Sequence, residues 1–138
     1  MILIVCVDKN NGMLFNRRRQ SRDTALIEHV IELSNNNNLW IKNFSKDIFE
    51  QYELKNLKID EELLEHAEND DYCFIEDILL SNIIDKFDKI ILYNWNRKYP
   101  ADLYFDIDLT EWILEGEVNF KGNSHDQITQ KIYKRGLN

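Results

Sequence analysis

Asp23 is the residue whose type and position best fit a chemical role. It stands at the start of an apolar segment with helical spacing, Asp23 to Leu33. A carboxylate there can cap the helix, where the dipole favours its charge, or it can act as a proton relay. The cap is the favoured interpretation of Asp23, and the proton relay is the alternative. As a cap alone, its replacement by alanine should cost about 1 kcal/mol, which serine or asparagine would largely restore.

The three histidines do not have the spacing of a metal site. His29, His66 and His125 are far apart, and no pair forms the H-x-x-x-H pattern that places two ring nitrogens on one helix face. We predict solvated histidines and no bound metal. Ser124, His125 and Asp126 are sequence neighbours, whose side chains rarely converge, so we predict a turn there and not a catalytic triad.

The charged residues predict an acidic surface with one basic segment. The net charge of −8 disfavours nucleic acid as a partner, because that affinity comes from cations that neutralise phosphates. Arg17, Arg18 and Arg19 form the basic run, which we predict to be a solvated loop, with phosphate binding as the alternative. Three acidic pairs are expected in solvent as well: Glu61-Glu62, Asp70-Asp71 and Glu76-Asp77.

Length and composition predict one domain over residues 1–138. With 43% hydrophobic residues, a chain of this size can bury a substantial core. Cys6 and Cys73 lie inside apolar runs, where a thiol behaves as a small buried hydrophobe, so no disulfide framework is expected. The opening run, Ile2 to Val7, is too short for a signal peptide or a membrane span. We therefore predict a cytoplasmic protein without a membrane partner.

Most of the chain alternates between strand and helix patterns. Short apolar runs rich in β-branched residues predict strands, and apolar residues spaced three or four apart predict helices. The predicted strands are Ile2–Val7, Leu39–Ile41, Asn56–Asp60, Tyr72–Ile75 and Lys89–Asn94. The predicted helices are Asp23–Leu33, Ser45–Tyr52, Glu61–Glu68 and Ile78–Phe87. This alternation favours a mainly parallel sheet flanked by helices.

The pattern changes after Trp95. Strands are predicted at Leu103–Ile107, Trp112–Phe120 and Ile128–Lys134, and turns between them. The last two form a long hairpin. The predicted fold class is α/β, with a mixed, mostly parallel central sheet and an antiparallel C-terminal hairpin at its edge.

Several stretches resemble dihydrofolate reductase, in the same order along the chain. The first is ILIVCVDKNNGMLFN, and the most specific is KIILYNWNRKYPADLYF, followed by DLTEW and by the final strand ITQKIYKR. The resemblance implies a dihydrofolate reductase-like fold over residues 1–138, in a short and diverged member. It implies NADPH as cofactor, Gly12 and Lys46 as cofactor-binding residues and Asp23 as the proton-steering carboxylate.

The chain departs from the family where the cofactor and substrate would bind. Glu76-Asp77 stands where relatives have a double glycine that lets the backbone approach a pyrophosphate, and two carboxylates there would repel phosphate. Tyr93 stands in place of the threonine that partners the catalytic carboxylate, and Met13-Leu14-Phe15 in place of the second loop glycine. These changes remove groups that the reaction needs.

The sequence therefore predicts a dihydrofolate reductase-like protein without a cofactor that has lost NADPH-dependent reductase activity. It would act as a binding or accessory protein for an unidentified protein or small molecule. The alternative is a diverged NADPH-dependent reductase of a pterin or another small heterocycle, with Asp23 as proton donor. On the first hypothesis, NADPH binds no more tightly than the millimolar range, or about −4 kcal/mol.

Overall fold

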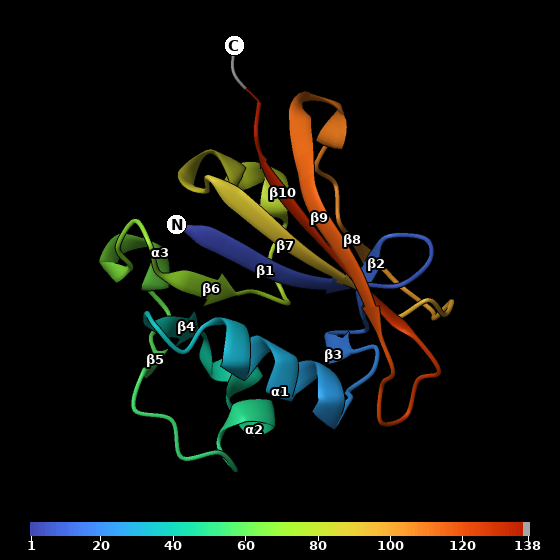
Figure 1. Cartoon of the computed structure of the whole chain (residues 1–138), viewed down its shortest axis with the longest axis horizontal. Helices are drawn as coiled ribbons and strands as arrows, with labels where there is room; N and C mark the ends of the chain where they lie inside the picture. The colour runs from blue at the N-terminus through green and yellow to red at the C-terminus, as the bar shows by residue number, and fades with distance from the viewer. Residues whose placement is uncertain (137–138) are drawn as a thin grey trace.

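A computed structural model describes residues 1–136 and shows a seven-stranded sheet in the order β5-β4-β6-β1-β7-β10-β9 (Figure 1). β1 (Ile2–Val7) is the middle strand, and it runs parallel to β6 (Tyr72–Phe74) and β7 (Lys89–Asn94). β4 (Leu39–Ile41) and β5 (Leu57–Ile59) extend the parallel part. The centre of the sheet is therefore formed by β6, β1 and β7, all three of which lie at predicted strands.

The other edge of the sheet is antiparallel, as predicted. β10 (Ile128–Arg135) pairs antiparallel with β7 and with β9 (Trp112–Phe120), and the pairing with β9 has an irregularity between Ile132 and Tyr133. The mixed α/β fold class is therefore confirmed. The two strands are joined by residues 121–127, which lie close to the start of α1 (Figure 1).

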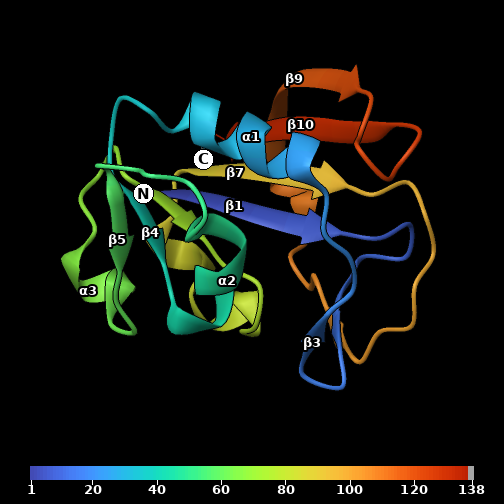
Figure 2. The ribbon, with the colours of Figure 1, turned by 90° about the horizontal axis from the view of Figure 1, so that it is seen from below.

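Two helices cover one face of the sheet (Figure 2). α1 (Thr24–Leu33) and α2 (Lys46–Phe49) lie over this face, and the 3-10 turn η1 (Asn43–Ser45) leads directly into α2. Leu26, Ile27 and Val30 of α1 are buried against sheet residues such as Ile4 and Ile91. The apolar spacing that predicted α1 thus corresponds to its buried side.

The opposite face is covered by shorter elements. These are α3 (Leu63–His66), the 3-10 turns η2 (Leu80–Asn82), η3 (Ile84–Lys86) and η4 (Leu109–Glu111), and a small sheet of β3 (Arg18–Arg19), β2 (Gly12–Phe15) and β8 (Leu103–Tyr104). Leu80, Phe87 and Phe105 from this layer pack with Leu3 and Val5 of β1. Apolar side chains are thus buried on both faces of β1, as its continuous apolar run predicts.

Two predicted elements are wrong. The predicted helix Ile78–Phe87 is the pair of 3-10 turns η2 and η3, because Ser81 and Asn82 favour turns and the Ser81 amide donates to Asp106 Oδ1 at 3.1 Å. The predicted strand Leu103–Ile107 keeps only two strand residues, and they pair with β2 in the small sheet rather than with the hairpin edge.

The segment after β1 is a tight hairpin and not the predicted loop. β2 and β3 pair antiparallel, with Phe15 opposite Arg18, so Asn16 and Arg17 are the two turn residues. Both have left-handed backbone angles, with φ of 51° and 60°. Such turns usually contain glycine, because side chains disfavour positive φ. The hairpin therefore holds Arg17 in a conformation that glycine would adopt more easily.

No helix within residues 1–136 is long and apolar enough to cross a membrane.

Candidate functional site

Asp23 caps α1 and also holds the loop that joins β9 to β10. Its Oδ1 accepts from the amide of Ala25 at 2.9 Å and from that of Leu26 at 3.4 Å, which confirms the predicted N-cap. The same carboxylate accepts from the amides of Asn123 and Ser124, each at 2.8 Å. A single buried carboxylate thus joins two segments that lie about a hundred residues apart in sequence.

His125 completes this cluster. It is buried, so the prediction that it is solvated is wrong. Only 3% of it is exposed, its Nδ1 lies 2.9 Å from Asp23 Oδ2, and its ring stacks on Trp95. Its Nε2 lies 2.9 Å from the hydroxyl of Tyr99 and 3.3 Å from that of Ser21. We call this carboxylate, imidazole and hydroxyl chain the Asp23 cluster.

The other two histidines differ. His66 is exposed, as predicted, whereas His29 is half-buried, with Nδ1 2.7 Å from the hydroxyl of Tyr93. The predicted turn at residues 124–126 is confirmed by the bond from the Gly122 amide to the His125 carbonyl, at 2.9 Å.

The hydrogen bonds to Asp23 determine its protonation. Burial opposes ionisation, but the donors from Asn123, His125, Ser124 and Ala25 outweigh that effect and hold the pKa of the carboxyl well below its ordinary value. A general acid at neutral pH needs a pKa near 7. The hydrogen bonds therefore favour the ionised form of Asp23, which accepts hydrogen bonds from these donors.

The half-buried Arg19 and the buried Glu76 form a second cluster, at the carboxyl end of β6. Arg19 donates from Nε to Glu76 Oε1 at 2.6 Å and from Nη2 to Oε2 at 2.7 Å, a bidentate pair. The Ser45 hydroxyl donates to the same Oε2 at 2.6 Å. Burial alone would lower the pKa of Arg19, but Glu76 and then Asp47 raise it above its usual value. We call this group the Arg19 cluster.

The Arg19 cluster closes the space between α1, α2 and the ends of β1 and β6. The remaining inner cavity measures about 10 Å³. Its walls combine apolar side chains with the Arg19 cluster: Cys6, Arg19, Ser21, Arg22, Leu26, Ile27, Ile48, Phe74, Glu76 and Trp95. Burial, with a smaller effect of Glu76, raises the pKa of the Cys6 thiol, so this cysteine is a neutral wall residue. Such a space holds about one water molecule.

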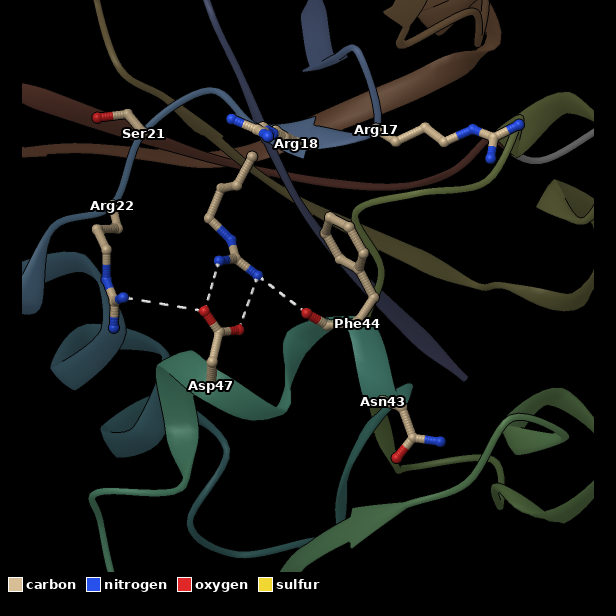
Figure 3. A pocket seen from close by; sticks show the side chains of 8 residues that line it. Arg17, Arg18, Ser21, Arg22, Asn43, Phe44 and Asp47 are labelled. Carbon is tan, nitrogen blue, oxygen red and sulfur yellow. Dashed lines mark hydrogen bonds and ion pairs between the residues drawn. The ribbon is translucent and has the colours of Figure 1, made fainter.

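A larger pocket of about 550 Å³ opens outside the Arg19 cluster (Figure 3). It lies between the β2–β3 hairpin, the segment before α1 and the start of α2. Four arginines and one acid line it, together with three other residues: Arg17, Arg18, Arg19, Ser21, Arg22, Asn43, Phe44 and Asp47. We call it the arginine pocket. The Ser21 hydroxyl points away from the arginines in Figure 3, consistent with its contact to His125.

The three residues predicted to form a site, Asp23, Gly12 and Lys46, share no hydrogen bond within the described residues. Asp23 lies in its own buried cluster, and neither Gly12 nor Lys46 is among the residues that line the arginine pocket. The Gly12 amide donates to Asp8 Oδ1 at 2.8 Å, and a Cβ atom there would lie 2.6 Å from that of Ala101. Lys46 is exposed at the first position of α2 and makes no ion pair within the described residues.

The prediction that the acidic pairs are solvated is wrong for three residues. Glu76 is only 8% exposed and Asp71 only 4%. Asp71 accepts from the Trp40 indole at 2.9 Å, and Asp77 is half-buried, 3.2 Å from Lys42 Nζ. Within residues 1–136, no three His, Cys, Asp or Glu side chains are grouped so that they could hold a metal ion.

Sequence reasoning missed both clusters because their members are distant in sequence. Arg19 meets Glu76 across 57 positions, and Asp23 meets His125 across 102. One local signal existed. Glu76 directly follows the buried Phe74 and Ile75, and an acid that continues an apolar strand is buried unless the chain turns outward. A buried acid requires a partner, which the nearby arginine run could supply.

Known proteins share the fold of this chain but little of its sequence. No protein-family model matches it, and no curated protein matches it in sequence. Among solved structures, it is similar to dihydrofolate reductase from Enterococcus faecalis, described as a complex with NADP(H) and RAB-propyl. The TM-score is 0.70 at 14% identity, and the match covers 99% of this chain and 96% of that one. The fold is therefore dihydrofolate reductase-like.

Proposed function

We propose that this chain is a dihydrofolate reductase-like protein that has lost NADPH-dependent reductase activity and acts by binding an unidentified protein or small molecule. The inner cavity carries this proposal. It measures about 10 Å³, whereas sites for small organic ligands occupy roughly 300–1,000 Å³. Arg19 and Glu76 line this cavity, and their bidentate pair holds both side chains in place there.

The residues at the end of β6 do not fit a dinucleotide. The solved structure similar to this chain is described with NADP(H), and a pyrophosphate needs backbone amides or unpaired cations. At this strand end Glu76 adds a buried carboxylate, Arg19 is paired with it, and Lys42 is paired with Asp77. This arrangement supports a protein that works without the cofactor.

The Asp23 cluster supports the same proposal. A reductase of this fold would use Asp23 to deliver a proton, with Gly12 and Lys46 contacting the cofactor. Asp23 instead accepts six hydrogen bonds from the protein, and its lowered pKa keeps it ionised. The alternative function would also require Arg19 and Glu76 to separate, which leaves a buried charge without its partner.

A turnover assay tests the proposal. Purified protein is mixed with NADPH and dihydrofolate, and NADPH oxidation is followed by its absorbance. We expect no rate above that of the mixture without protein, even with protein at substrate concentration. Protein-dependent oxidation that Asp23→Asn abolishes would establish the alternative, a diverged reductase. Asn keeps the shape of the side chain and removes only the ionisable group.

A further inference from the structure

The arginine pocket contains more positive charge than its neighbours neutralise. Four of the six arginines of this acidic chain line one pocket, and Asp47 is its only acidic wall residue. Glu76 lies behind Arg19 and neutralises a second charge. Among the lining residues and Glu76, two positive charges therefore remain, on a chain whose net charge is −8. Two further acids lie near the pocket: Glu61 accepts from the amide of Asn43 at 2.7 Å, and Asp102 accepts from the amide of Asn16 at 3.0 Å.

The surplus lies on the three arginines around Arg19. Among the described residues, Arg17 and Arg18 make no ion pair, and Arg22 Nη1 is 3.9 Å from Asp47 in a pair that is more than half exposed. Exposed pairs of this kind contribute little. Figure 3 shows the guanidinium group of Arg22 directed toward Asp47, and that of Arg17 directed away from Asp47 and Phe44. The charges that line the pocket without a strong partner are therefore mainly those of Arg18 and Arg22.

The fold fixes the backbone positions of Arg17 and Arg18, and ion pairs hold the side chain of Arg19. Arg18 lies in β3, opposite Phe15, and Arg17 occupies a turn position with φ of 60°. Arg19 is held by Glu76, Asp47 and the carbonyl of Phe44, so the base of the pocket does not need to order when a ligand arrives. Preorganised groups lose less entropy on binding and so bind more tightly.

We propose that the arginine pocket binds a small polyanion with two or more phosphate or carboxylate groups. This inference rests on the proposed binding role and names its ligand class. Guanidinium forks match phosphate and carboxylate oxygens bidentately, and two or more separated arginines require more than one anionic group. The volume of about 550 Å³ suits a small molecule. The surrounding negative charge disfavours a nucleic-acid strand.

Isothermal titration calorimetry of the full chain with inorganic triphosphate and with citrate, at low salt, tests this site. We expect saturable binding of one ion per chain, weaker as sodium chloride is added. Arg18→Ala and Arg22→Ala should each weaken it about tenfold, because each removes a charge-assisted hydrogen-bonding group. The control is Arg97→Ala, which removes the same charge from an exposed residue outside the pocket lining and should change affinity less than about twofold.

A gain of affinity provides a second readout. Asp47→Asn removes the acidic wall residue and leaves Arg19 paired with Glu76, so triphosphate should bind severalfold more tightly. The probe that binds more tightly shows whether the pocket prefers phosphate or carboxylate groups. Three results would overturn the proposal. They are the absence of saturable heat with both probes, a loss of affinity in Arg97→Ala as large as in the pocket variants, and binding of duplex RNA that is tighter than binding of either probe. None of these results bears on NADPH oxidation, which tests the proposed function separately.

Discussion

The Asp23 cluster and the Arg19 cluster each contain a buried carboxylate, but they satisfy it differently. Asp23 accepts from backbone amides, a hydroxyl and an imidazole, all supplied by the protein. Glu76 is neutralised by a full cation, Arg19, which is one of four arginines in a pocket with one acidic wall residue, Asp47. The first cluster is complete in itself and joins two segments. The second cluster adjoins the arginine pocket, whose remaining positive charge can bind an anionic ligand.

Among the variants that compare the two clusters, the one that removes Arg19 should lose the most stability. Arg19→Met leaves Glu76 buried without its cation, and breaking such pairs costs about 3–5 kcal/mol. Urea unfolding measures the loss. Arg18→Met is the matched control, and it should change the free energy of unfolding by no more than about 0.5 kcal/mol because Arg18 is exposed.

The double variant Arg19→Met, Glu76→Met sharpens this test. Replacing both partners by apolar side chains removes the unpaired charge, so most of the lost stability should return. If the single variant is as stable as wild type, Arg19 and Glu76 do not form the pair that closes the cavity.

Asp23→Ala should have the next largest effect, about 3 kcal/mol, because it removes a helix cap and leaves buried donors in the 122–125 loop without an acceptor. Asp23→Ser should restore only the cap, about 1 kcal/mol, since its single oxygen cannot reach both segments. Thermal and urea unfolding measure both losses of stability.

The control is Asp108→Ala, which removes an exposed cap of η4 and should cost no more than about 1 kcal/mol. Full restoration by serine would mean that the cap is the whole role of Asp23.

The smallest effect concerns pH. Because the folded-state pKa of Asp23 lies below its unfolded value of about 3.9, its stabilisation is complete above that value and is lost as pH falls below it. Asp23→Asn has no carboxyl to titrate. The stability difference between wild type and this variant should stay constant down to about pH 5 and then shrink. Parallel stability curves down to about pH 2.5 would show that the carboxyl has an ordinary pKa.

The central strands and the hairpin edge were predictable because their patterns are local. Ile2–Val7 and Lys89–Asn94 are apolar, β-branched runs, and each forms a strand with those bounds. Ile78–Phe87 also has helical apolar spacing, but Ser81 and Asn82 in its middle favour turns. Its apolar side chains pack in the same core as β1 even though the backbone forms 3-10 turns. A periodic pattern alone did not determine the backbone there.

The two clusters were less predictable. The cap role of Asp23 follows from its position before an apolar helix, but nothing local indicates that His125 meets it. The arginine run reads as a solvated loop, and only the hairpin turn and the burial of Glu76 bring Arg19 inward. Contacts of this length depend on the strand order of the whole sheet.

The most direct test of the closed cavity is a titration with NADPH followed by tryptophan fluorescence, with excess inorganic triphosphate present. Trp95 lines the inner cavity, and triphosphate competes for any binding that involves only the phosphates and the arginine pocket. We predict no saturable quenching up to about 1 mM NADPH, a limit near −4 kcal/mol. Saturable quenching with a micromolar midpoint that triphosphate does not displace would show that the cavity opens to the cofactor.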